Sequence, residues 1–176
     1  MKTRLMTVAV AALLAAAGSF AQAADQNVTI NASVSSFCSI SSSANTTQTV
    51  ATNGSGHVTG MSGSPPSITF TCNAASNVAL TSTNGAITLG GFSEGSLSPA
   101  PFGFSNKIEY TASVTGDGSP VSLDTTSAVS ASGSFYSGAA ATTTSVTITP
   151  IDPTNPLLAS GLGSYSDTLV VAINPA

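Results

Sequence analysis

Apolar and polar residues alternate along most of this chain, which is the pattern of β-strands that bury one face. Between residues 28 and 40 six apolar side chains share the even positions: Val28, Ile30, Ala32, Val34, Cys38 and Ile40. The same period of two returns in residues 68–72, 78–80, 108–114, 146–148 and 165–173. Weaker strands are expected near Thr49, Val58, Ile87 and Phe135. No segment after residue 24 shows the apolar period of an amphipathic helix, about 3.6 residues.

Turn-forming residues separate these runs. Three dipeptides favour tight hairpin turns: Asn53-Gly54, Asn84-Gly85 and Asp117-Gly118. Short strands joined by such turns predict an all-β protein, and more specifically a β-sandwich. Residues 25–176 contain no linker that would divide them, so we expect a single domain.

The first 24 residues have the composition of a secretory signal peptide. Lys2 and Arg4 supply a positive start, residues 8–17 are uninterruptedly apolar, and residues 21–23 read Ala-Gln-Ala, a small-residue cleavage site. A membrane anchor is the alternative interpretation, but an apolar run of this length is too short to span a bilayer, which takes about 20 residues. We therefore expect export through the periplasm to the cell surface or the medium, without membrane insertion.

Charge is sparse, and this excludes whole classes of partner. The full chain has three Lys and Arg residues against seven Asp and Glu residues. Without residues 1–24 the one remaining cation is Lys107, and the net charge is −6. A nucleic-acid partner is not expected, because so few cations cannot neutralise a phosphate backbone. Recognition is expected to depend on apolar contacts and backbone hydrogen bonds.

The two cysteines, Cys38 and Cys72, both lie in the exported part, where the compartment favours a disulfide. A metal site is the alternative. It needs more ligands at characteristic spacing, and the sequence offers no C-x-x-C pair and a single histidine, His57. We expect a Cys38–Cys72 disulfide and neither a metal ion nor another cofactor.

Residues 91–95 match G-x-S-x-G, the pattern of a hydrolase nucleophile turn. That turn needs a strand before Ser93, a helix after it and a histidine later in the chain. No histidine follows Ser93, and Pro99 disfavours a helix. Chance explains the match in a chain rich in Ser and Gly, so we predict no catalytic residues and do not expect an enzyme.

Three stretches together resemble a known family. One is the alternating segment that leads into the first cysteine, NVTINASVSSFCSI, and another is the strand around the second, ITFTCNAASNVALTS. The third is the start of the last strand, where a Gly-x-Tyr-x-Asp-Thr motif contains Gly163, Tyr165, Asp167 and Thr168. Their order and spacing are similar to those of the spore coat protein U-like domain, which includes pilus subunits (pilins) of the archaic chaperone–usher class.

The resemblance implies an immunoglobulin-like β-sandwich that lacks one strand. In that family a periplasmic chaperone fills the gap first, and the N-terminal segment of the next subunit replaces it at an outer-membrane usher, by β-strand addition. Residues 25–35 are the candidate donor strand here, with an apolar face made of Val28, Ile30, Ala32 and Val34. The implied function is a structural subunit of a surface pilus, or fimbria, that serves attachment or biofilm formation and binds identical or related pilins.

Alternatives remain open. Residues 25–35 are explained equally well as the first strand of a complete sandwich, and the protein is then a self-contained secreted coat or matrix protein. Several Thr-x-Thr stretches suggest an ice- or surface-binding protein, although they follow no fixed period. One departure from the family lies at the C-terminus, where the last strand ends in Pro175 and Ala176 instead of an aromatic residue. Pro175 has no N–H to donate to a strand ladder, which bears on chaperone contact more than on the fold.

Overall fold

The structure is a computed structural model that describes residues 31–42, 47–94, 100, 103–158 and 164–176. The chain divides into two units, Met1–Val34 and Ser35–Ala176. The predicted signal peptide and the donor positions Val28 and Ile30 lie outside the described residues. In the first unit, residues 31–34 belong to no strand.

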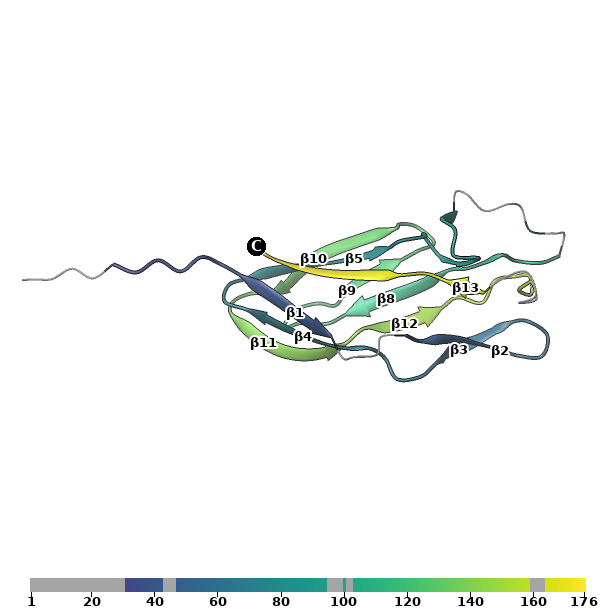
Figure 1. The fold of residues 1–176 in the computed structure, drawn as a ribbon, viewed down its shortest axis with the longest axis horizontal. Helices are drawn as coiled ribbons and strands as arrows, with labels where there is room; N and C mark the ends of the chain where they lie inside the picture. Colours follow the sequence, from purple (N-terminus) through teal and green to yellow (C-terminus); the bar gives the residue numbers. More distant parts are fainter. Residues whose placement is uncertain (1–30, 43–46, 95–99, 101–102, 159–163) are drawn as a thin grey trace, which may run out of the picture. The chain divides into compact units, whose positions relative to one another are not determined.

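The second unit is built from short strands (Figure 1). In chain order they are β1 (Cys38–Ser42), β2 (Thr49–Thr52), β3 (Val58–Ser62), β4 (Ser67–Cys72), β5 (Ser76–Ser82), β6 (Ile87–Leu89), β7 (Lys107–Ile108), β8 (Tyr110–Val114), β9 (Val121–Asp124), β10 (Ser130–Tyr136), β11 (Ala140–Ser145), β12 (Thr147–Pro150), β13 (Tyr165–Ser166) and β14 (Leu169–Pro175). Nearly every run predicted from the alternating pattern contains one of them, including the four weaker ones. The run at residues 28–40 is occupied only in part: its strand, β1, begins at Cys38, and the described residues before Cys38 belong to no strand.

The strands pair into several small antiparallel sheets. One has the order β1-β4-β11 and another the order β12-β8-β9. Because Val146 alone separates β11 from β12, these two sheets follow one another along a single chain segment. A third sheet has the order β10-β5-β14, a fourth the order β13-β6-β7, and β2 pairs with β3. The prediction of an all-β sandwich is confirmed.

The core lies between these sheets, and the alternating pattern fills it. In β4, β5, β8 and β9 every second side chain is buried. Phe70 of β4 and Phe135 of β10 meet edge to face, with ring centroids 4.9 Å apart. Such aromatic pairs add about 0.5–1.5 kcal/mol to the stability that burial already gives. The largest fully buried side chains come from several of the sheets: Tyr110, Phe70, Phe135, Leu80, Ile108 and Leu123.

Two of the three predicted hairpins are confirmed and one is wrong. Asn53-Gly54 joins β2 to β3 and Asp117-Gly118 lies between β8 and β9, and both strand pairs are antiparallel. Asn84-Gly85 follows β5, but β5 pairs with β10 and β14, not with β6. The Asn84 N–H is bound by Asp167 at 2.9 Å, and the Gly85 N–H by the Ser82 hydroxyl at 2.9 Å. These bonds turn the chain out of its sheet instead of back along it.

The predicted disulfide is confirmed. Cys38 and Cys72 face each other in the β1–β4 ladder, with Cα atoms 4.2 Å apart, and their sulfur atoms are bonded. Among the described strands β1 pairs with β4 alone, so this bond is the covalent attachment of an edge strand to its sheet.

Replacing Cys38 by Ser is expected to lower the free energy of unfolding by roughly 3.5–4 kcal/mol, because an open loop of this length regains conformational entropy when the chain unfolds. Urea denaturation of oxidised protein measures the loss. Ser41→Ala, an exposed position on the same strand, is the control and is expected to change stability by less than about 0.5 kcal/mol. Equal midpoints for the two variants would contradict the prediction.

Candidate functional site

The C-terminal strand β14 has one free edge. It pairs with β5 on one side, over its whole length from Leu169 opposite Ser82 to Pro175 opposite Ser76. On the other side no strand pairs with it in the described part of the chain. β14 therefore ends a three-stranded sheet, and an unpaired strand edge is a template for pairing with another chain.

The ladder with β5 shows which backbone groups this edge offers. Thr83 donates its N–H to the Thr168 carbonyl at 3.0 Å, and Ala176 donates to the Ala75 carbonyl at 2.8 Å. In an antiparallel ladder alternate residues point their N–H and C=O groups toward the partner strand. Even positions of β14 thus face β5, and odd positions present their backbone groups at the free edge.

Pro175 occupies an odd position, so its nitrogen points toward the free edge and the ladder with β5 is not interrupted. Its pairing with Ser76 is retained, and the next residue, Ala176, still donates to the carbonyl of Ala75, just before β5. This is where proline is tolerated in a sheet, on an edge strand with its nitrogen turned outward. The N–H groups that the free edge does offer belong to Leu169, Val171 and Ile173.

The side chains of the same three residues face the core but are incompletely covered. Val171 lies opposite Leu80 and Ile173 opposite Val78, two residues that are fully buried. Leu169, Val171 and Ile173 pack against the core but stay half-buried. Part of the apolar surface inside the sandwich is therefore left exposed along β14.

Strand β1 borders the same edge. It lies next to β14, and no backbone pairing joins the two strands among the described residues (Figure 1). Ile40 of β1 lies opposite Phe70 and so points to the core side, yet Ile40 is 42% exposed and Phe70 is 0% exposed. Core-facing side chains are thus half-exposed on both strands that flank this edge of the sandwich.

The predicted donor residues and the C-terminal motif are placed as follows. Of the four donor positions, Ala32 and Val34 are described and belong to no strand.

In the motif, Gly163 lies outside the described residues. Tyr165 is in β13 and donates its phenol proton to the Ser105 carbonyl at 2.8 Å, and burial raises the pKa of this phenol. The motif threonine, Thr168, acts through its carbonyl, which accepts both the N–H and the hydroxyl of Thr83.

Asp167 is the centre of the motif. One carboxylate oxygen accepts the hydroxyls of Ser82 and Tyr110, each at 2.6 Å, and the other accepts the Asn84 N–H at 2.9 Å. Burial and the adjacent Asp167 carboxylate raise the pKa of the Tyr110 phenol above its usual range. Asp167, two residues before the start of β14, is thus bonded to β5, to the turn after β5 and to β8. The motif fixes where the free strand begins.

Three contacts between titratable side chains join segments of the chain. His57 Nδ1 lies 3.2 Å from Asp152 Oδ2, and the other oxygen of that carboxylate accepts the Val58 N–H at 2.8 Å. Lys107 contacts both Glu94 and Glu109. Burial lowers the pKa of Lys107, but its hydrogen bonds to Glu109 and Glu94 outweigh this and raise it above the ordinary value. Asp152 is 95 residues from His57 and Glu94 is 13 residues from Lys107, so no local pattern predicts these two contacts, whereas Glu109 is only two residues from Lys107.

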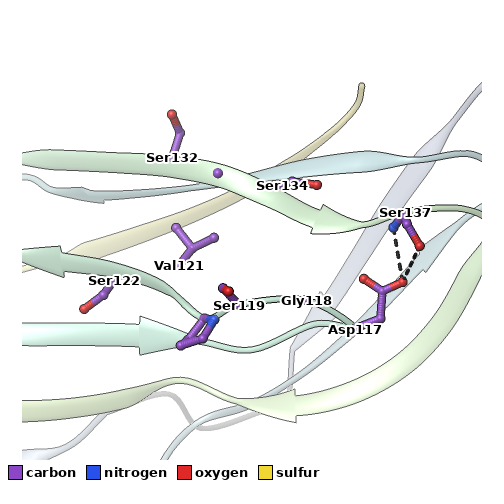
Figure 2. Close-up of a pocket in the computed structure, with 10 residues that line it drawn as sticks. Asp117, Gly118, Ser119, Val121, Ser122, Ser132, Ser134 and Ser137 are labelled. Carbon is purple, nitrogen blue, oxygen red and sulfur yellow. Dashed lines mark hydrogen bonds between the residues drawn. The ribbon is translucent and has the colours of Figure 1, made fainter.

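An open pocket of about 480 Å³ lies between β9 and β10. Small polar residues dominate its lining, as Figure 2 shows, among them Ser122 of β9 and Ser132 and Ser134 of β10. Its charged residue, Asp117, accepts the N–H and the hydroxyl of Ser137 at 3.1 and 2.9 Å. The acid is thus already engaged at one end of the pocket, and we assign no chemistry to this site.

Within the described ranges, no group of three or more His, Cys, Asp or Glu residues is arranged to hold a metal ion. No helix of the described part is long and apolar enough to cross a membrane. Comparisons of the chain with protein-family models, with characterised proteins and with solved structures find no match.

Proposed function

We propose that this protein is a structural subunit of a surface pilus, and that a strand donated by a neighbouring subunit completes its sandwich at the free edge of β14. The observation that carries the proposal is the combination, on one strand, of an unpaired backbone edge with half-exposed side chains that face the core. Strand addition satisfies both at once, because main-chain hydrogen bonds extend the sheet and alternate side chains cover the apolar surface.

The chain itself contains a segment of the right pattern. Residues 25–35 alternate between polar and apolar side chains and precede the first strand of the domain. Burying Val28, Ile30 and Val34 contributes roughly 1.5–3 kcal/mol for each side chain. The apolar face of this segment matches the side chains that β14 leaves uncovered, and its polar face suits the outer surface of a sheet.

The same edge explains a need for partners before assembly. An unpaired edge with apolar side chains beside it promotes aggregation. A periplasmic chaperone that lends a strand protects such an edge, and an outer-membrane usher is the place where the next subunit replaces it. These partners, export to the cell surface and a role in attachment or biofilm formation come from the family resemblance and belong to the proposal.

The proposal predicts that residues 25–36 bind a subunit from which residues 25–34 have been removed. Surface material from cells that produce the full protein is expected to give a ladder of polymers on gels run in SDS without heating. A chaperone-released subunit without residues 25–34 is expected to add no further subunit, but to bind a synthetic peptide of residues 25–36 in a one-to-one ratio.

The control peptide carries serine in place of Val28, Ile30 and Val34 and is expected not to bind. Purified residues 25–176 that melt cooperatively as a monomer would overturn the proposal. The protein would then be a self-contained secreted sandwich.

A further inference from the structure

Asn73 holds the chain immediately before β1. Its side-chain oxygen accepts the Phe37 N–H at 2.7 Å, and its side-chain NH₂ donates to the Ser35 carbonyl at 2.9 Å. Its backbone N–H donates to the Phe37 carbonyl at 3.2 Å, which continues the β1–β4 register by one pair beyond the two cysteines. Residues 35–37 are therefore held in line with β1, beside β4, although they lie outside the strand.

These bonds from Asn73 to Ser35 and Phe37 are called the clamp below. Under the proposed function, the donor segment of a subunit can bind either a neighbouring subunit or its own free edge, and the clamp affects that choice. Residues 25–34 are covalently joined to β1, and β1 lies next to β14. A short tether gives an effective concentration in the millimolar range, far above that of separate subunits, unless geometry prevents the tether from reaching. A subunit that filled its own free edge would not join a fibre.

We propose that Asn73 is a positioning residue that prevents the donor segment from filling the free edge of its own subunit, an inference that rests on the proposed function. To reach that edge with its apolar face toward the core, the chain must reverse its direction before β1 through an odd number of residues, at the tightest about three, because residues directly opposite each other point to the same face. With residues 35–37 held by Asn73, the turn falls at residues 32–34, and residue 28 comes level with Cys38. Of the four apolar donor positions, only Val28 then reaches the sandwich.

Without the clamp, the disulfide fixes the chain only at Cys38. The turn then forms at residues 35–37, residue 34 comes level with Cys38, and all four apolar positions reach the free edge. The clamp thus deprives a self-inserted strand of Ile30, Ala32 and Val34, whereas a strand donated to another subunit keeps every apolar contact. Asn73 in this way favours exchange between subunits over self-completion.

The test is Asn73→Ala in the full mature chain, residues 25–176. Monomers and polymers are separated by size, and hydrogen exchange of residues 25–34 is measured in each fraction. The ratio of protected monomer to polymer is expected to rise about tenfold over wild type, in line with two lost hydrogen bonds of ordinary net strength. Asn73→Asp keeps the acceptor of the 2.7 Å bond to the Phe37 N–H but removes the NH₂ donor to the Ser35 carbonyl, and is expected to shift the ratio in the same direction by a smaller factor.

Asn77→Ala, an exposed asparagine of β5, is the matched control and is expected to leave the ratio unchanged. A purely structural role would reduce monomer and polymer together and would not protect residues 25–34 in the monomer. If wild type forms protected polymers and both clamp variants keep the wild-type ratio, this inference is wrong and the proposed function stands. If residues 25–34 exchange freely in every fraction of wild type, the proposed function itself fails.

Discussion

Replacing Ile30 by Asp is expected to abolish SDS-resistant polymers while the domain still folds. In the proposed assembly Ile30 lies in the middle of the donated strand and faces the half-covered side chains of the neighbour's β14. An aspartate there would have to enter an apolar site without a partner, which is costly. Residues 25–176 contain one Lys or Arg residue, Lys107, and Glu94 and Glu109 already bind it. The measurement is the polymer ladder on unheated gels, together with the yield of chaperone-bound subunit.

Thr29→Asp supplies the matched control, because the same charge at the neighbouring position points to the polar face of the segment. Polymers of that variant are expected to persist. An opposite result has a clear meaning: if Ile30→Asp unfolds the isolated domain, residues 25–35 are an internal strand and not a donated one.

Much of the fold could be predicted from the sequence because it depends on local alternation. The runs around Phe70, Leu80 and Tyr110 each alternate between buried and exposed side chains, and a two-residue period places them in sheets without knowledge of their partners. The disulfide was predictable for a different reason: the predicted signal peptide places both cysteines in a compartment that favours a disulfide, and the sequence offers no set of metal ligands.

Strand pairing was less predictable, because it depends on residues distant in the sequence. Asn84-Gly85 has the composition of a hairpin turn, yet its backbone is bound by Asp167, which is 83 residues away from Asn84. Alternation also failed as a guide to length. Residues 31–37 continue the pattern of β1 but lie outside any strand, because alternation records which face is apolar and not whether a partner strand is present.

The candidate site was the least predictable part. The C-terminal motif identified Asp167 and Tyr165 as residues of interest, but not what they contact. The free edge of β14 follows from sheet order, which no local pattern contains. The orientation of Pro175 follows from the ladder register. Its nitrogen points to the free edge of β14, so this proline does not interrupt the pairing of the last strand with β5. Asn73 had no distinguishing pattern at all.

Replacing Asp167 by Ala is expected to lower the free energy of unfolding by about 3–5 kcal/mol. The substitution removes three hydrogen bonds to a charged group, each of which contributes roughly 1.5–3 kcal/mol, and it leaves the hydroxyls of Ser82 and Tyr110 without their acceptor. Partial rehydration of Asp167, which is half-buried, keeps the total below the simple sum of the three. Urea denaturation of the domain completed by a bound peptide of residues 25–36 is the measurement.

Asp167→Asn is expected to lose about half as much, because its oxygen still accepts one or two of the three protons. Asp124→Ala is the control, since that carboxylate bonds only to nearby Thr126 in an exposed turn, and we expect a change within about 1 kcal/mol. Comparable losses at positions 124 and 167 would show that the motif aspartate is an ordinary surface residue. A large loss at Asp167 alone is expected to be accompanied by faster hydrogen exchange in β14, because this carboxylate fixes the chain just before the free strand begins.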